Sequence, residues 1–308
     1  MGKKFLSLLL ATALVSTTLL TGCGSEAETQ KQTETSDTKK DAKDNKAILV
    51  VSFGTSYNNS RNITIGGIES AIAEAHPDYQ LRNAFTSQII IDKLAKRDGI
   101  KIDNVKEALK RAEDDGITEL VIQPTHLMNG LEYTDLKEEV EKNKDKFSKI
   151  TLGAPLLSSD EDFSNVANAI TEMTKAYDDG ETAICFMGHG TTADSNKIYA
   201  ELNDKLHEEG HENCYVGTVE ATPSCEDVIN EIKSHGGYKK VVLRPLMVVA
   251  GDHANNDMAD PEDPESWYSQ FTKAGFEVTP VLKGLGQEWE IEKLYVDHTN
   301  AAIEKLGK

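Results

Sequence analysis

The sequence predicts an α/β protein with two similar domains whose parallel sheets face a central cleft. Two observations predict this class. Short β-branched runs alternate with longer helical patterns from residue 47 to residue 308, and two motifs recur in the same order in both halves. Alternation of apolar strands with helices is typical of parallel sheets that are covered on both faces. A length of 308 residues also suits two domains.

The predicted elements divide the folded part into a domain over 47–157 and a domain over 158–308. In the first domain we expect strands at 47–53, 79–85, 119–123 and 149–153. Three helices are expected in this domain. The first ends near Ala75, the second spans 104–115 after an Asp/Asn cap, and the third spans about 132–142. In the second domain we expect strands at 182–187, 215–219, 241–246 and 277–281, separated by segments of helix length.

The two halves resemble each other at motifs that follow their strands. The segment VSFGTS (51–56) can be laid over GHGTT (188–192), and VIQPTHLMNG (121–130) over VLRPLMVVAG (242–251). We interpret this as a duplicated α/β unit. Ligands of such folds bind at the carboxyl ends of the strands. All four motifs are therefore expected to line the cleft.

The first 46 residues predict an exported lipoprotein. Lys3 and Lys4 precede an apolar stretch over 5–20, and the segment ends in Leu-Thr-Gly-Cys at Cys23. This pattern indicates a signal peptide over 1–22, and the ending resembles a bacterial lipobox, in which the cysteine is lipidated. An ordinary signal peptide with a chance cysteine is the alternative. Residues 24–46 contain no Val, Ile, Leu, Phe, Tyr or Trp, so 23–46 is expected to be a disordered tether. The predicted location is the outer face of the cell membrane or the periplasm.

Charge and cysteine content exclude several function classes. With 33 Lys and Arg against 52 Asp and Glu, the net charge is −19, which argues against nucleic-acid binding and against adsorption of the folded body to anionic lipid. No C-x-x-C spacing occurs, so a zinc ribbon or a thioredoxin-like site is excluded. A Cys214–Cys225 disulfide is left open. Because the chain also lacks phosphate-loop and G-x-S-x-G motifs, a nucleotide site or a serine hydrolase has little support.

Three histidines follow strands in glycine-flanked loops: His126, His189 and His253. The remaining histidines, at polar helix ends or turns, are expected to be solvated surface residues; they are His76, His207, His211, His235 and His298. Glu220 follows the strand between the loops of His189 and His253. Two imidazoles and one carboxylate at adjacent strand ends predict an open metal site that suits Co, Fe, Ni or Zn better than Ca or Mg.

Seven ordered segments identify a family. They are ILVVSFGTSY (48–57), FTS with KLAKRDGI (85–87 and 93–100), HLMNGLEY (126–133), LGAPLLSS (152–159), FMGHGTT (186–192), VGTVEATPS (216–224) and PLMVVAGDHANNDMA (245–259). From Ala47 to the C-terminus the chain resembles the anaerobic, CbiK-type cobalt chelatases (sirohydrochlorin cobaltochelatases) of the class II chelatase superfamily. The resemblance implies two flavodoxin-like, or chelatase-like, α/β domains. A lipobox departs from the family pattern, because cobalamin synthesis is usually intracellular.

The resemblance also implies the chemistry. His189, Glu220 and His253 would hold the metal and act as catalytic residues, with His189 as principal ligand and base. The chain would insert Co²⁺, with Fe²⁺ or Ni²⁺ as alternative substrate metals, into sirohydrochlorin or a related tetrapyrrole during cobalamin biosynthesis, with no nucleotide. A homo-oligomer is compatible with this interpretation. The alternative function is a membrane-anchored lipoprotein that binds tetrapyrrole, haem or metal for uptake.

The octacarboxylate substrate that the resemblance implies calls for local cations in an acidic protein. The candidates are Arg61, Arg82 and Arg244, each of which could equally be an ordinary solvated arginine.

Overall fold

The computed structural model describes residues 45–307. The predicted signal peptide over 1–22, Cys23 and nearly all of the predicted tether over 23–46 lie outside the described residues. The first strand, β1, spans Lys46–Ser52, so it begins at the last residue of the predicted tether and one residue before the predicted strand. No helix within 45–307 is both long and apolar enough to cross a membrane.

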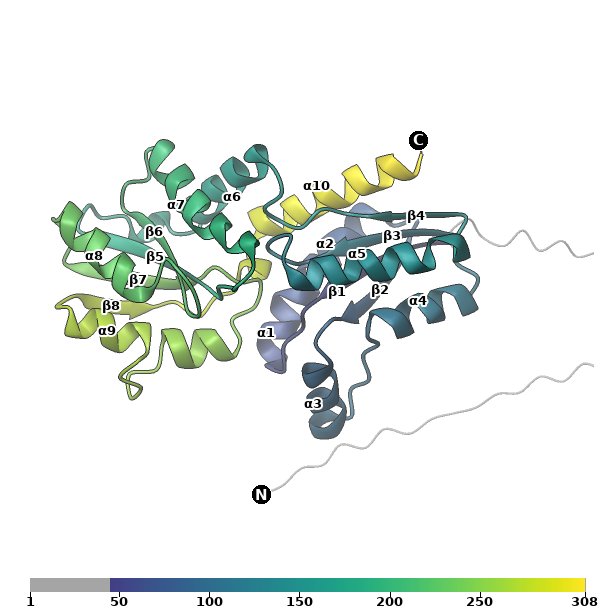
Figure 1. Cartoon of the computed structure of the whole chain (residues 1–308), viewed down its shortest axis with the longest axis horizontal. Helices are drawn as coiled ribbons and strands as arrows, with labels where there is room; N and C mark the ends of the chain where they lie inside the picture. Colours follow the sequence, from purple (N-terminus) through teal and green to yellow (C-terminus); the bar gives the residue numbers. More distant parts are fainter. Residues whose placement is uncertain (1–44, 308) are drawn as a thin grey trace, which may run out of the picture. The chain divides into compact units, whose positions relative to one another are not determined.

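The first sheet contains four parallel strands in the order β2-β1-β3-β4 (Figure 1). After β1, the strands are β2 (Gln80–Phe85), β3 (Glu119–Pro124) and β4 (Lys149–Leu152). The helices that connect or follow them are α1 (Asn58–Ile63), α2 (Ile65–Ala75), α3 (Gln88–Asp98), α4 (Val105–Asp114) and α5 (Leu131–Asn143). All four strands expected from the sequence are present, with bounds that differ by one residue.

The second sheet repeats this arrangement in the order β6-β5-β7-β8, again with parallel strands only. Its strands are β5 (Thr182–Gly188), β6 (Cys214–Thr218), β7 (Lys240–Pro245) and β8 (Glu277–Pro280). The remaining helices are α6 (Asp160–Glu172), α7 (Ile198–Glu208), α8 (Cys225–His235), α9 (Trp267–Lys273) and α10 (Trp289–Leu306). Numbered within each half, both sheets have the order 2-1-3-4, which is that of flavodoxin-like folds. The α/β class and the duplicated unit are thus confirmed.

Local sequence signals set several helix starts. At α4, the Asn104 side chain accepts a hydrogen bond from the backbone N–H of Glu107, whose carboxylate accepts one from the backbone N–H of Asn104. Ser224 and Asp227 form the same reciprocal capping box at α8. Each box satisfies two backbone donors that a helix start would otherwise leave unpaired. The start of α4 agrees with the cap predicted at the beginning of the 104–115 helix.

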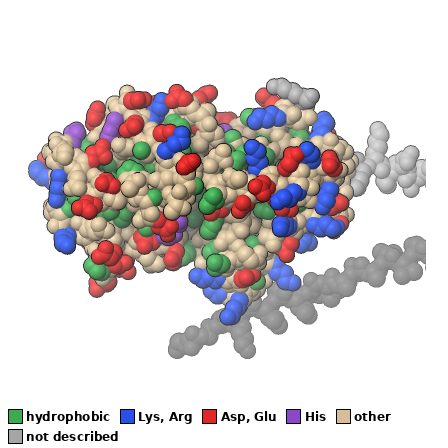
Figure 2. Space-filling view, in the orientation of Figure 1, with side chains coloured by type: hydrophobic (Ala, Val, Ile, Leu, Met, Phe, Trp, Pro, Cys, Tyr) green, Lys and Arg blue, Asp and Glu red, His purple; other side chains and the backbone are tan. Residues whose placement is uncertain are grey.

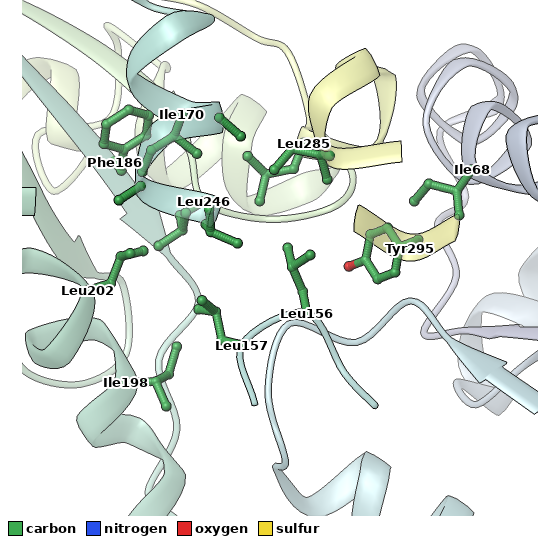
Figure 3. Close-up of a cluster of buried hydrophobic side chains, with 14 of the residues drawn as sticks. Ile68, Leu156, Leu157, Ile170, Phe186, Ile198, Leu202, Leu246, Leu285 and Tyr295 are labelled. Atoms are coloured by element: carbon green, nitrogen blue, oxygen red, sulfur yellow. The ribbon is translucent and has the colours of Figure 1, made fainter. Parts of the chain in front are cut away.

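One apolar core is shared by the two halves (Figure 3). It contains side chains from β1 and β3 of the first sheet and from β5 and β6 of the second, together with Leu156 and Leu157 of the connecting segment. The C-terminal helix α10 contributes Tyr295 to this core and packs against α2 and β3, so the chain returns to the first sheet at its end. The predicted boundary between residues 157 and 158 stays a prediction.

The three described cysteines, Cys185, Cys214 and Cys225, are free thiols. Cys214 begins β6 and Cys225 begins α8, and burial raises the pKa of both thiols to about 12. The structure therefore contains no Cys214–Cys225 disulfide. Both side chains act as small buried hydrophobic groups.

Candidate metal centre

Three neighbouring strands of the second sheet deliver the candidate ligands. His189 directly follows β5, Glu220 follows β6 by two residues, and His253 lies in the loop after β7. Pairing between β5 and β6 continues beyond the strands, because the N–H of Glu220 donates to the carbonyl of His189 at 2.9 Å. The order β6-β5-β7 places all three loops at one edge of the sheet.

The three side chains converge on one point. One ligand atom from each of His189, Glu220 and His253 lies within 4.8 Å of the others. The two imidazole rings meet edge to face with centroids 4.4 Å apart, and Nδ1 of His189 is 3.8 Å from Oε2 of Glu220. The His189 and Glu220 side chains are 46% and 55% exposed, so the cluster is open to an incoming ligand. Such a set can hold a divalent metal while leaving coordination positions free.

Hydrogen bonds fix which ring nitrogen each histidine presents. Nδ1 of His189 lies 2.8 Å from the carbonyl of Gly190, and Nδ1 of His253 lies 2.8 Å from Oδ2 of Asp257. Both partners are acceptors, so each Nδ1 carries the proton and donates. The Nε2 lone pairs of both rings are then free to bind a metal. A single π-helical turn over Ala254–Met258 contains Asp257, whose carboxylate lies within hydrogen-bond distance of Nδ1 of His253.

The glycines around His189 are required by the backbone and by packing. Gly190 has φ of +89°, and a Cβ there would lie 2.9 Å from the backbone nitrogen of Ala221. A Cβ on Gly188 would lie 2.1 Å from the ring of Tyr199. We expected these glycines to leave the imidazole unscreened. They also let the loop turn sharply and let Tyr199 pack beneath it.

Two residues of the first half of the chain form hydrogen bonds with the loop that contains His253. Ser60 of α1 accepts a hydrogen bond from the N–H of Ala250 at 3.1 Å, and the hydroxyl of Tyr57 donates to Asp252 at 3.2 Å. Burial, and then the Asp252 carboxylate, raise the pKa of the Tyr57 hydroxyl. Both contacts join segments about 190 positions apart. The sequence contained no signal for either contact.

His126 lies outside the cluster. Both of its ring nitrogens are buried and have no hydrogen-bond partner among the described residues, although the residue as a whole is partly exposed. Burial lowers the pKa of His126 to about 4, so the ring is neutral at neutral pH. His126 is not part of the cluster formed by the three candidate ligands.

The prediction of a solvated His298 is wrong. Its side chain is only 12% exposed, and Nε2 lies 2.9 Å from Oδ1 of Asp162. Its Nδ1 lies 3.2 Å from the carbonyl of Ala154. The residue is buried because α10 crosses to the first sheet and packs against β4 and α6. His298 therefore ties the C-terminal helix to the segment that connects the two halves.

Two of the three predicted carboxylate-binding arginines are already paired. Arg244 is buried, with its side chain 2% exposed and its guanidinium 2.8 Å from Glu288. Arg82 pairs with Asp115 at 2.7 Å. Neither is free to bind a substrate carboxylate, so both predictions are wrong. Arg61 donates to Asn58 at 2.8 Å within α1 and remains a candidate.

The fold is shared with chelatases of known structure. The described architecture is similar to that of SirB from Bacillus subtilis with Fe³⁺, with a TM-score of 0.62 over 85% of this chain and 98% of that one, at 15% sequence identity. The chain thus has a chelatase-like α/β fold, with two flavodoxin-like units and an open His/Glu/His cluster at strand carboxyl ends. This likeness concerns the fold.

The sequence comparisons specify the family. The model of the cobalt chelatase (CbiK) family matches residues 46–304, and the chain belongs to that family. It is 39% identical over 258 residues to the sirohydrochlorin cobaltochelatase of Salmonella typhimurium, covering 84% of this chain and 96% of that protein. It is 34% identical over 263 residues to the sirohydrochlorin cobaltochelatase CbiKC of Nitratidesulfovibrio vulgaris, covering 85% of this chain and 92% of that protein.

Proposed function

We propose that this protein is a sirohydrochlorin cobaltochelatase, which inserts Co²⁺ into sirohydrochlorin as a step of cobalamin biosynthesis. The observation that carries the proposal is the convergence of His189, Glu220 and His253 within 4.8 Å at the strand ends of one sheet. Relatives with this activity match over nearly their whole length. Cobalt is the proposed metal because imidazole and carboxylate ligands suit it, and Fe²⁺ and Ni²⁺ are alternative substrates.

The residues would divide the reaction as follows. Insertion replaces two pyrrole N–H protons by one divalent metal, so two protons leave for each metal that enters. Nε2 of His189 would bind the metal first and accept a proton once the metal has moved to the ring, because its Nδ1 is already engaged by Gly190. His253 would be the second ligand. Glu220, the most exposed of the three side chains, would bind the metal or pass protons to solvent.

A turnover assay tests this proposal. Purified protein with Co²⁺ and sirohydrochlorin should give the absorbance change of the metallated ring at a rate well above the protein-free reaction. His189→Ala serves as the matched control and should return the rate to that of the protein-free reaction. If wild type does not exceed the protein-free rate with Co²⁺, Fe²⁺ or Ni²⁺, the proposal is refuted.

We further propose that the mature chain is anchored through a lipidated Cys23. The basic start, the apolar segment and the Leu-Thr-Gly-Cys ending support this, although they lie outside the described residues. Acyl chains contribute about 0.8 kcal/mol per buried CH₂, so a diacylated cysteine would anchor firmly. Cys23→Ser should release the protein from the membrane fraction and leave chelatase activity unchanged. A Ser variant that stays in the pellet after a high-salt wash would contradict lipid anchoring.

The predicted export also favours a second candidate function, a lipoprotein that binds tetrapyrrole or metal for uptake. Ligands of this type serve storage as well as catalysis, so the turnover assay separates the two functions. Tight binding of haem or of cobalt-sirohydrochlorin, without metallation of the free ring, would favour the uptake function.

A further inference from the structure

A basic cavity lies beside the loop that follows β1. It has a volume of about 380 Å³ and is lined by Ser56, Tyr57, Asn58, Lys93 and Arg97. The two cations come from α3, which projects from the first half. Figure 2 shows Lys and Arg side chains gathered on this projection. In a protein with a net charge of −19, α3 is slightly basic, with Lys93, Lys96 and Arg97 against Asp92 and Asp98.

Lys93 is available to a ligand. It is exposed and makes no hydrogen bond or ion pair with any residue from 45 to 307. Other described lysines form ion pairs, for example Lys240 with Asp179 at 2.7 Å. An unpaired ammonium at the wall of a cavity is a ready partner for an anion.

Hydrogen bonds hold the Arg97 guanidinium in place and leave its Nη1 without a described acceptor. Its Nη2 donates to the carbonyl of Ser56 at 2.6 Å and to Asn58 at 3.1 Å, and its Nε donates to Asp98 at 2.8 Å. No described residue accepts a hydrogen bond from its Nη1. The hydrogen bond from Arg97, and also the charge of Arg61, lower the pKa of Asp98. Asp98 pairs with Arg97 but does not line the cavity, whose lining contains two cations, Lys93 and Arg97, and no carboxylate.

The cavity adjoins the candidate metal centre through Tyr57. The Tyr57 ring lines the cavity, and its hydroxyl donates to Asp252, the residue before His253. On the same loop, Phe53 leaves half of its side chain exposed, which offers apolar surface. A ligand with an apolar body and an anionic edge, placed over the metal centre, could extend past Tyr57 and reach Lys93.

We propose that this cavity binds carboxylates on the periphery of the tetrapyrrole, with Lys93 and Nη1 of Arg97 as the donors. This inference rests on the proposed function, since it assigns part of the binding site for its substrate. It also explains how a strongly acidic protein could bind a substrate with eight carboxylates. Arg82 and Arg244, which the sequence offered for this role, are paired elsewhere.

Direct binding of metal-free sirohydrochlorin to the full chain, followed by fluorescence without cobalt, tests the proposal. Lys93→Gln should raise the dissociation constant roughly tenfold, the usual size of one lost charge-assisted hydrogen bond. It should also weaken the salt dependence of binding. The matched control is Lys96→Gln, which removes the same charge from the same helix outside the cavity and should bind as wild type does. The Co²⁺ affinity of all three proteins should be equal.

Arg97→Gln should weaken binding as well, but Lys93→Gln is decisive because Lys93 supports no other residue. If Lys93→Gln and Lys96→Gln bind sirohydrochlorin equally, the cavity does not bind the substrate and the proposal is overturned. If the difference appears while wild type fails to metallate the ring, the cavity assignment holds and the proposed chelatase function falls. If wild type does not bind sirohydrochlorin, both fall.

Discussion

The hydrogen bond from His253 to Asp257 offers a sharp test of how the metal centre is built. Nδ1 of His253 donates to Oδ2 of Asp257 at 2.8 Å, which reserves Nε2 for the metal. In Asp257→Ala the ring loses its acceptor, so it can rotate and can carry the proton on Nε2 instead. Rotation turns Nε2 away from the metal position, and a proton on Nε2 blocks its lone pair. Both changes are expected to weaken Co²⁺ binding.

The expected loss of Co²⁺ affinity depends on how exposed the His253 and Asp257 side chains are. Loss of an outer-shell partner of a metal-binding histidine usually costs about 10- to 100-fold in affinity, or about 1.4–2.7 kcal/mol. The two side chains are 33% and 40% exposed, so solvent weakens the hydrogen bond. We therefore expect the low end, about tenfold. Asp257→Asn keeps an acceptor oxygen and should lose only about threefold.

Two measurements check this prediction. Titration with Co²⁺ in the absence of tetrapyrrole gives the dissociation constants of wild type and both variants. The ¹⁵N shifts of the His253 ring show which nitrogen carries the proton, a change that general loosening of the fold would not produce. Co²⁺ affinity of Asp257→Ala within twofold of wild type would refute the reasoning, as would an unchanged His253 tautomer in that variant.

Further predictions concern the other residues of the site and the fold. In the same titration, His189→Ala should abolish Co²⁺ binding and His253→Ala should weaken it less completely. His126→Ala should leave Co²⁺ binding nearly intact. Equal loss of Co²⁺ binding in His126→Ala and His189→Ala would contradict the ligand assignment. The pKa of His126 is lowered from 6.5 to about 4, so the stabilisation present above pH 6.5 is lost as the pH falls toward 4. Wild type should lose about 3 kcal/mol more than His126→Gln between pH 7 and pH 4, measured by urea unfolding, and parallel losses would contradict the burial argument. Arg244→Met leaves Glu288 unpaired and should cost about 3–5 kcal/mol of stability with no change in KM for sirohydrochlorin; a raised KM at unchanged stability would instead place Arg244 in the cleft.

The fold could be predicted from the sequence because its signals are local. Five strands, β1, β3, β5, β6 and β7, are short apolar runs buried along nearly their whole length, as is typical of parallel sheets. The edge strands β2, β4 and β8 are less buried, yet all eight could be found to within a residue or so. Asn104 marked a helix start through a side chain that contacts its own helix. The proximity of His189, Glu220 and His253 also followed, because the carboxyl ends of adjacent parallel strands meet at one sheet edge.

The errors arose where a distant segment decides the environment. His298 has polar neighbours in the sequence and is buried only because α10 packs on the first half. Arg244 lies in an apolar strand, which could have signalled burial, but its partner Glu288 is 44 residues away. Tyr57 and Asp252 meet across 195 positions. Periodicity and spacing contain no record of such contacts.

The central claim is that the metal held by His189, Glu220 and His253 is the metal that enters the ring. A single-turnover experiment tests it most directly: protein loaded with one Co²⁺ is mixed with metal-free sirohydrochlorin, and the absorption of protein-bound cobalt and of the ring is followed together. The account predicts that the protein-bound signal decays at the same rate as the metallated ring appears, and that His189→Ala shows neither change. Metallation that proceeds while protein-bound cobalt persists, or that proceeds equally fast in His189→Ala, would contradict it.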